Sequence, residues 1–309
     1  MVKILVLGAT GGTGAAITEE LIKRQIPVRV FGRSLSKLEQ RWPHVEAATG
    51  DIFDQQAIVT ASRGISLIVQ CAAIPYSQTV TKQLLLAKTV LQAAKQMKIP
   101  VIFIDGIYAY GKNPGHPIKE NDPYLPVSRK GKVKKALAEL LNDPIYANIK
   151  PTLIHLPDYF GPTARKSSYL GATLIGIAQQ KVTFYIGRKN VKREFIYLPD
   201  AAQMITNIIL DPSTYGQSWN ISGQLITGKQ LINYAQKASG SKKIVFTMTK
   251  PLIRLTGLFD SNVREITEMY YLTADPVILD GNKYRQHFGN LVQTPFATSI
   301  DQTIKSLQK

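Results

Sequence analysis

Cysteine is almost absent from the sequence, since Cys71 is the only one among 309 residues. A single thiol excludes a framework of internal disulfides and fits a protein kept in a reducing compartment. Long apolar runs are missing too. The first one, VKILVLG at residues 2–8, ends at a glycine before it reaches the length of a signal-peptide core or a membrane span. We therefore expect a cytoplasmic protein with no membrane partner.

Acidic residues are scarce, with 21 Asp and Glu against 38 Lys and Arg, which gives a formal net charge of +17. This charge favours anionic partners such as nucleic acid, anionic surfaces or phosphate-bearing small molecules. The basic residues are spread along the chain, however, with dense groups only at 129–135 and 188–193, and no nucleic-acid-binding motif accompanies them. We therefore do not expect a dedicated nucleic-acid role. No metal is expected either, because ligand spacing is missing among the histidines His44, His116, His155 and His287.

Short apolar runs alternate with amphipathic stretches through the first half of the chain. Strands are predicted at 2–7, 27–31, 45–49, 66–70 and 101–105, with helices at 12–24, 35–42, 54–62 and 78–98. Further strands are predicted at 151–155, 193–197 and 217–221. Continuous apolar strands that are each followed by a helix are typical of a parallel sheet covered on both faces. We predict an α/β protein with a Rossmann-type doubly wound parallel sheet and a smaller C-terminal cap. The predicted Rossmann domain is 1–160, with 190–222 returning to it, and the cap is 161–189 with 223–309.

A glycine-rich turn joins the first predicted strand to the first predicted helix. In VLGATGGTGAAITEEL, Gly8, Gly11 and Gly14 have the spacing G-x-x-G-x-x-G, with Gly12 in addition. Such glycines allow a tight turn and bring backbone N–H groups against a pyrophosphate at the helix N-terminus. Two hydroxyl donors, Thr10 and Thr13, lie in the same turn. Because the motif follows an apolar strand and opens a helix, it predicts a dinucleotide-binding site.

The end of the second predicted strand distinguishes between the two nicotinamide dinucleotides. An NAD site usually has a carboxylate there, which accepts hydrogen bonds from the ribose hydroxyls. This chain has Arg33 and Ser34 instead, followed by Lys37. An arginine suits a 2′-phosphate, with the serine and lysine as additional contacts. The sequence favours NADP(H) over NAD, although a plain surface arginine is the alternative.

Two later segments fit the same binding site. Asp51 and Ile52, after the third predicted strand, are expected near the adenine. Cys71, Ala72 and Ala73 follow the fourth predicted strand, where small residues allow a close approach to the cofactor. Either segment alone is compatible with an ordinary loop. Their order along the chain supports the assignment.

Several motifs together resemble the extended or atypical short-chain dehydrogenase/reductase superfamily, in particular its NAD-dependent epimerase/dehydratase-like branch. They run over nearly the whole chain: GATGGTG, GDIFD, CAA, FIDGIYAYG, HLPDYFGP, REFIYLPDAA, WNISG and LDGNKYRQHFG. Working members have a Tyr-x-x-x-Lys pair on a helix and a Ser or Thr at the end of the preceding strand. The resemblance therefore implies a tyrosine that transfers the proton and a lysine that holds the nicotinamide ribose.

This chain departs from that pattern at two positions. We align the tyrosine with Gly131 and the lysine with Lys135, and we align the strand-end hydroxyl with Gly106. Lys135 would then hold the ribose, and Asp105 would lie beside the cofactor. The proton donor must come from elsewhere: Tyr108 is the first candidate and Tyr110 the second, with Asp105 or water as alternatives. Packing against the cap is an equally good interpretation of Tyr108.

The resemblance also implies contacts from the second half of the chain. The backbone of Leu156, Pro157 and Tyr159 is expected along the nicotinamide edge. Asp158 and Arg193 are candidates for substrate binding, the arginine because it matches one that contacts the diphosphate of sugar nucleotides in relatives. The alternatives are a turn cap for Asp158 and an edge-strand salt bridge for Arg193.

Three functional hypotheses follow. The first is an NADP(H)-dependent enzyme that reduces or oxidises a carbonyl or alcohol, or epimerises a sugar nucleotide, with a nonstandard active site. The second is a non-catalytic sensor that binds NADP(H) and reports its redox state. The third, a nucleic-acid binder, ranks below both. The expected partner is a small molecule that bears a phosphate or nucleotide, and a homodimer is compatible with all three.

Overall fold

The computed structural model describes residues 2–165, 168–256 and 266–308. The chain divides into two compact units. Unit 1 comprises Met1–Asp105, Val133–His155 and Ala201–Trp219, and unit 2 comprises Gly106–Lys132, Leu156–Asp200 and Asn220–Lys309. Among the described residues, none of the helices combines the length and the hydropathy needed to cross a membrane.

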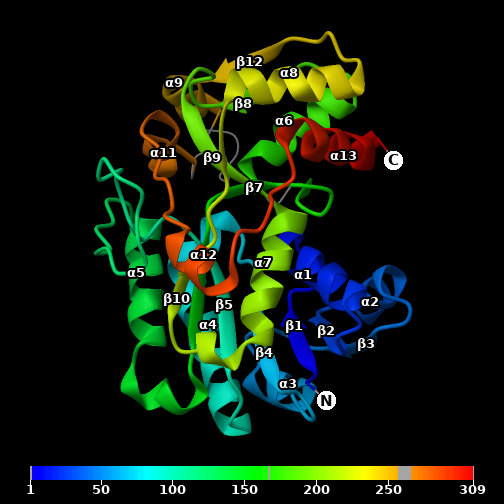
Figure 1. Ribbon diagram of the computed structural model, residues 1–309, viewed down its shortest axis with the longest axis vertical. Helices are drawn as coiled ribbons and strands as arrows, with labels where there is room; N and C mark the ends of the chain where they lie inside the picture. Colours follow the sequence, from blue (N-terminus) through cyan, green and yellow to red (C-terminus); the bar gives the residue numbers. More distant parts are fainter. Residues whose placement is uncertain (1, 166–167, 257–265, 309) are drawn as a thin grey trace. The chain divides into compact units, whose positions relative to one another are not determined.

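Unit 1 is built on a seven-stranded parallel sheet with the strand order β10-β6-β5-β4-β1-β2-β3 (Figure 1). The strands are β1 (Ile4–Leu7), β2 (Val28–Gly32), β3 (Glu46–Thr49), β4 (Leu67–Gln70), β5 (Val101–Gly106), β6 (Thr152–Leu156) and β10 (Ser218–Asn220). In register, Leu7 pairs with Phe31 on one side and with Gln70 on the other. All four residues of β1 are buried, as expected for an apolar strand covered on both faces. The predicted Rossmann-type sheet is confirmed.

Helices cover both faces of this sheet. They are α1 (Gly12–Lys23), α2 (Leu35–Arg41), α3 (Gln55–Ala61), α4 (Thr79–Met97), α5 (Arg129–Leu141) and α7 (Leu198–Leu210). Arg24, which follows α1, donates hydrogen bonds to Asn207 Oδ1 and to the carbonyl oxygen of Gln203 on α7. On the other face α3 packs against α4, and Lys134 of α5 donates to Gln83 of α4. The fold is therefore doubly wound, with its crossover helices shared between the two faces.

Unit 2 contains two small sheets and a layer of helices. One sheet has the order β11-β9-β7, and the other pairs β12 with β8 in parallel. The strands are β7 (Asp158–Phe160), β8 (Thr183–Ile186), β9 (Lys192–Tyr197), β11 (Gln224–Thr227) and β12 (Val245–Met248), and the helices are α6 (Tyr169–Ala178), α8 (Gly228–Ser239), α9 (Lys250–Thr256), α11 (Tyr271–Ala274), α12 (Asn282–Phe288) and α13 (Phe296–Gln308). The three helices α6, α8 and α13 pack against one another over a shared apolar core.

The observed units differ from the predicted domain ranges in four places, of which the two short ones are residues 156–160 and 220–222, both in unit 2. Residues 106–132 belong to unit 2 because Ile118 N donates to the carbonyl oxygen of Ile278, and Asp280 N donates to that of Ile118. Residues 190–200 also belong to unit 2, because β9 pairs with β7 and β11 and not with the large sheet. The later part of the returning segment, Ala201–Trp219, does lie in unit 1.

Candidate active site

The glycine turn after β1 is held so tightly that side chains do not fit. Gly8 has a φ of +81°, and a Cβ there would lie 2.5 Å from the Cα of Ala72. A Cβ on Gly14 would lie 2.3 Å from the carbonyl oxygen of Gly8. Gly11 is the N-cap of α1, and no side chain caps this helix end. The N–H groups at the start of α1 therefore have no side-chain cap, as at the helix N-termini that bind phosphates in other proteins.

The other predicted dinucleotide residues follow β2, β3 and β4, beside this turn. Arg33 is exposed and forms no ion pair with any described residue. Ser34 has a structural role, because its Oγ caps α2 by accepting a hydrogen bond from Lys37 N at 3.4 Å. Asp51 Oδ1 accepts from Phe53 N at 3.0 Å and closes a turn that also carries Ile52. Lys37 is exposed as well, and like Arg33 it forms no ion pair with any described residue.

The loop after β4 is fixed by a side chain that sequence reasoning missed. Gln70 donates to the carbonyl oxygen of Ala72 at 2.9 Å and accepts from its N–H at 3.3 Å. Cys71 N donates to the carbonyl oxygen of Leu7, and burial raises the pKa of its thiol, which stays protonated. The polar residue at the end of an otherwise apolar strand was the available signal. Ala72 and Ala73 thus present their small side chains from a rigid loop.

The two neighbouring lysines of α5 have opposite environments. Lys134 Nζ lies 2.6 Å from Asp105 Oδ1, and the Lys134 side chain is only 13% exposed. The same ammonium donates to Gln83 Oε1 at 3.1 Å. Lys135, which the sequence analysis aligned with the ribose-binding lysine, has a side chain that is 42% exposed. Its Nζ lies 3.9 Å from Oε1 of Glu139, one helical turn further along. The structure therefore places Lys134, and not Lys135, against the end of β5.

If Lys134 instead of Lys135 is aligned with the lysine of the Tyr-x-x-x-Lys pair, the tyrosine of that pair aligns with Lys130 instead of Gly131. Lys130 is fully buried, and its Nζ lies 3.0 Å from Glu268 Oε2. Burial alone would raise the pKa of Glu268, but Lys130 lowers it below its ordinary value. Gly131 itself leaves no room for a side chain, since a Cβ would lie 2.6 Å from the carbonyl oxygen of Tyr108. An ion pair thus occupies the position where relatives are expected to have a phenol.

Tyr108 lines a small cavity of unit 2, whose volume of about 20 Å³ has room for about one water molecule. Its hydroxyl donates to the hydroxyl of Tyr169 at 2.9 Å. The pocket brings Tyr108 together with the two predicted substrate residues and is lined by Ile107, Tyr108, Asp158, Tyr169, Ile186, Arg193, Glu194, Ile266, Met269, Leu272, Thr273, Pro276 and Val277. The cavity therefore combines apolar walls with a few polar groups.

Arg193 and Asp158 form an ion pair in this pocket. The Arg193 guanidinium donates to Asp158 Oδ2, and also to the carbonyl oxygen of Ile186 at 3.2 Å. Burial alone would lower the pKa of Arg193, but the Asp158 carboxylate raises it overall. Arg193 is not on an edge strand, because β9 is the central strand of its sheet, whereas Asp158 is on the edge strand β7. Its charges cancel locally, which leaves the pocket polar but nearly neutral.

Glu194 is a buried acid that sequence reasoning missed. Its carboxylate accepts hydrogen bonds from the backbone N–H groups of Gly223 at 2.7 Å and Leu279 at 2.8 Å. Burial raises the pKa of Glu194 to about 7 even so. A carboxyl group directly before the apolar run FIY in the same strand was the signal. The residue lines the Tyr108 pocket and titrates near neutral pH.

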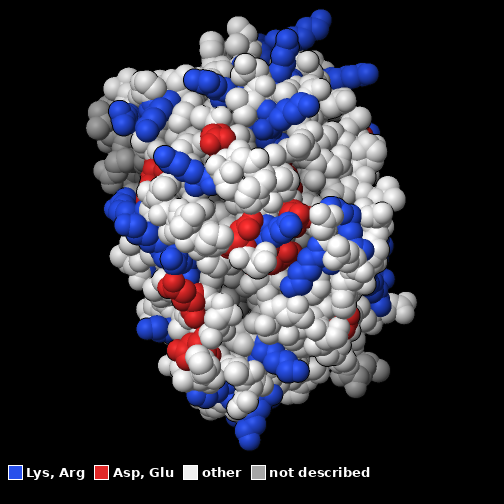
Figure 2. All heavy atoms as spheres, turned by 60° about the vertical axis from the view of Figure 1, so that its left-hand side comes forward, with Lys and Arg blue, Asp and Glu red and all other residues white. Residues whose placement is uncertain are grey.

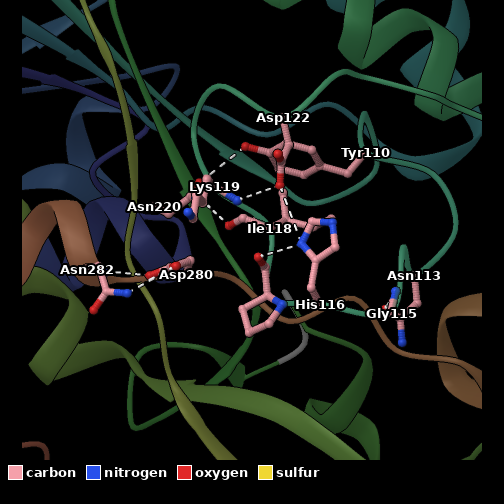
Figure 3. Close-up of polar contacts among 11 residues, drawn as sticks. Tyr110, Asn113, Gly115, His116, Ile118, Lys119, Asp122, Asn220, Asp280 and Asn282 are labelled. Atoms are coloured by element: carbon pink, nitrogen blue, oxygen red, sulfur yellow. Dashed lines mark hydrogen bonds and ion pairs between the residues drawn. The ribbon is translucent and has the colours of Figure 1, made fainter.

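Tyr110 belongs to a structural network (Figure 3). The residue is 2% exposed, and its hydroxyl donates to Asn220 Oδ1 at 3.2 Å. Asn220 in turn donates from Nδ2 to the carbonyl oxygen of Ile118, and its N–H donates to Glu120. Burial raises the pKa of Tyr110, which makes it a poor proton donor. This network orders the segment after β5.

The remaining predicted contacts lie where β6 continues into β7. Leu156 and Pro157 are buried, and Tyr159 is half-buried. In the part of the chain that the structure describes, no three His, Cys, Asp or Glu side chains gather in a group that could hold a metal ion.

Three features together define an extended short-chain dehydrogenase/reductase. They are the seven-stranded Rossmann-type sheet, the glycine turn that opens onto a helix and the lysine beside the end of β5. The profile of the NAD dependent epimerase/dehydratase family matches residues 4–222. The chain belongs to this family, so the resemblance seen in the sequence is confirmed.

Curated relatives and solved structures agree with this assignment. The uncharacterized UDP-glucose epimerase YtcB of Bacillus subtilis (strain 168) is 23% identical over 269 residues, which are 78% of this chain and 83% of that protein. The UDP-N-acetyl-alpha-D-glucosaminuronate decarboxylase of Bacillus cytotoxicus is 25% identical over 242 residues, with 72% and 75% covered. The UDP-glucuronic acid 4-epimerase of Bacillus cereus, solved with UDP-glucuronic acid and NAD, has a TM-score of 0.80 at 18% identity and covers 99% of both chains. At that identity the structural match establishes the fold.

Proposed function

We propose that this chain is an NADP(H)-dependent enzyme that reduces or oxidises a carbonyl or alcohol carbon of a nucleotide-linked sugar, with a nonstandard proton donor. When bound, the nicotinamide ring supplies or accepts the hydride. The sugar-nucleotide class is supported by relatives whose names include UDP-glucose and UDP-glucuronic acid. The observation that carries the proposal is the pair of hydroxyl groups, Tyr108 and Tyr169, inside a pocket.

Unit 1 supplies the binding groups for the dinucleotide. The uncapped start of α1 would receive the pyrophosphate, and the exposed Arg33 would bind the 2′-phosphate. Lys134 would donate to the ribose hydroxyls. Its anchors, Asp105 and Gln83, fix the direction of the ammonium group.

Tyr108 would transfer the proton to or from the substrate oxygen. A hydroxyl can rotate to suit its partner, so Tyr108 can donate to a substrate while Tyr169 turns to donate to Tyr108. A hydrogen bond received by Tyr108 would stabilise the phenolate that remains after proton transfer. General acid catalysis of this kind contributes about 10²–10⁴-fold to a rate.

The experiment is a turnover assay with NADPH against UDP-sugars and simple carbonyl compounds. We expect Tyr108→Phe to lower kcat by about 10²–10⁴-fold without changing the Kd for NADPH, and Tyr169→Phe to have a smaller effect of the same kind. Tyr110→Phe is the matched control, because its hydroxyl is bound to Asn220. Unchanged turnover in Tyr108→Phe would exclude this residue as the donor.

A non-catalytic NADP(H) sensor is the second candidate. The ion pair of Lys130 with Glu268 favours it, because it fills the position of the missing tyrosine with a group that is already neutralised. The sensor predicts tight NADPH binding with no turnover of any compound in the same panel. Turnover that depends on Tyr108 would eliminate it.

A further inference from the structure

Much of the net positive charge of the chain comes from two segments without acids. Residues 159–193 contain seven Lys or Arg and no Asp or Glu, and residues 212–256 contain six and none. Most of the second segment and all of the first belong to unit 2. In Figure 2, Lys and Arg spheres predominate at the upper end, where Figure 1 draws α8, β8 and β12. This part of unit 2 therefore attracts anions at any physiological pH.

The small sheet formed by β8 and β12 has an unusual outer face. Its inner residues Tyr185 and Val245 are buried in the apolar core of unit 2. A sheet packed on one side normally presents polar residues on the other. Here the outward positions are apolar, and we call them the apolar face: Val182, Phe184, Ile244 and Phe246, with exposures of 56%, 41%, 61% and 48%.

The apolar face is a continuous patch. Phe184 and Phe246 are partners in the parallel register, and their ring centroids lie 6.0 Å apart. Val182 and Ile244 come two residues earlier on the two chains and therefore lie on the same side. Four exposed apolar side chains side by side on a protein with this charge indicate a surface that contacts something apolar.

Exposed cations stand at both ends of these two strands. We call them the cationic rim, which consists of Lys181, Arg188, Lys242, Lys243 and Lys250. None of the five forms an ion pair with another residue in the described ranges. Apolar side chains surrounded by unpaired cations match the interface of an anionic bilayer, which offers hydrocarbon below a layer of negative headgroups.

We propose that the apolar face and the cationic rim form a site for peripheral binding to an anionic lipid bilayer. Shallow insertion of the four apolar side chains would bring the five cations level with the headgroups. A bilayer fits better than single-stranded nucleic acid, because Val182 and Ile244 gain little from bases that stack on aromatic rings. It also fits better than a second copy, because two such rims would repel each other.

Vesicle co-sedimentation with the full chain tests this proposal. We expect binding to vesicles of equimolar phosphatidylcholine and phosphatidylglycerol, weaker binding as salt is raised, and no binding to phosphatidylcholine alone. Lys242→Glu with Lys243→Glu should lower the affinity by at least roughly 25-fold, since each basic residue contributes about fivefold. The matched control is Lys88→Glu with Lys132→Glu, two exposed lysines outside the rim.

The apolar contribution is tested separately. Phe184→Ser with Phe246→Ser should weaken vesicle binding by about tenfold for each ring that the bilayer covers. The control, Leu125→Ser with Val127→Ser, should not weaken it, because these two side chains are at least as exposed but lie outside the apolar face. Phe184→Trp, which preserves the fold, should be quenched by brominated phosphatidylglycerol.

Three results would overturn the proposal. The first is equal binding to neutral and anionic vesicles, and the second is equal loss of binding in the control variants. The third is the absence of binding to anionic vesicles. Oligothymidylate binding that depends on Phe184 and Phe246, or a dimer in sedimentation equilibrium that the Phe→Ser variant dissociates, would then identify another use of the face.

Discussion

Replacing Lys134 by alanine should destabilise the protein far more than replacing its neighbour Lys135. Lys134 Nζ lies 2.6 Å from Asp105 Oδ1, and the two side chains are 13% and 7% exposed. Removing the ammonium leaves a buried carboxylate without its partner, which costs about 3–5 kcal/mol in comparable ion pairs. Lys135 and Glu139 are 42% and 63% exposed and 3.9 Å apart, so their pair contributes about 0.3–0.5 kcal/mol.

The assay is urea denaturation of the two alanine variants, followed by fluorescence titration with NADPH. We expect Lys134→Ala to lose both stability and NADPH affinity, and Lys135→Ala to keep both. The double variant Asp105→Asn with Lys134→Met separates the two effects. It removes the unpaired charge and should recover most of the stability, while NADPH binding stays weak because no ammonium remains to hold the ribose.

Two results would refute this reasoning. If Lys135→Ala lost NADPH affinity while Lys134→Ala kept it, the assignment of the ribose lysine would be wrong. If both alanine variants lost the same small amount of stability, the buried pair with Asp105 would not exist in solution.

Three further predictions concern other parts of the chain. The pKa of Glu194 is near its ordinary value of 4.5 in the unfolded chain and about 7 in the folded protein. The free energy of unfolding should therefore fall by about 3 kcal/mol as the pH rises through this window. In urea titrations Glu194→Gln should remove this pH dependence, and Glu139→Gln should not. Arg33→Ala should lower the preference for NADPH over NADH by about 10- to 100-fold in fluorescence titrations, since a charge-assisted contact is worth roughly 1.5–3 kcal/mol. Gly131→Ala should destabilise by about 1–3 kcal/mol in thermal unfolding, although alanine favours helices, because its Cβ would meet the carbonyl oxygen of Tyr108.

Each of these predictions has a result that contradicts it. Equal pH slopes in the wild-type protein and in Glu194→Gln would place the titration elsewhere. Equal affinities for NADPH and NADH before any substitution would remove the role given to Arg33. A more stable Gly131→Ala would mean that the start of α5 has room for a side chain.

The sheet of unit 1 was predictable because its strands are buried on both faces and therefore apolar throughout. The run ILVL of β1 and the run that opens β5 carry this signal without any tertiary information. The glycine turn was predictable for a related reason: only glycine fits at positions 8 and 14, where a Cβ would lie 2.5 Å and 2.3 Å from backbone atoms. The membership of β9 was not predictable, because an apolar strand does not reveal which sheet it joins.

The site was less predictable because its details depend on long-range partners. The run KVKK contains two lysines in succession, and only the buried carboxylate of Asp105 shows which one points inward. Tyr108 and Tyr110 stand two residues apart after the same strand. One meets Tyr169 in a pocket and the other meets Asn220 in the core, at separations of 61 and 110 residues. Spacing along the chain does not contain this information.

The net charge of +17 is not explained by the site. Three basic side chains are buried at or near it, and each has its own acidic partner: Lys130 with Glu268, Lys134 with Asp105, and Arg193 with Asp158. Such pairs fix positions and add no net charge that could attract a phosphate. Much of the surplus lies instead in segments that contain no acids, where most of the described Lys and Arg side chains are exposed. A substrate alone would not require it, because a phosphate in a pocket needs only the few cations that touch it. A broad anionic surface interacts with many exposed cations at once, and this is the distribution of charge that unit 2 presents.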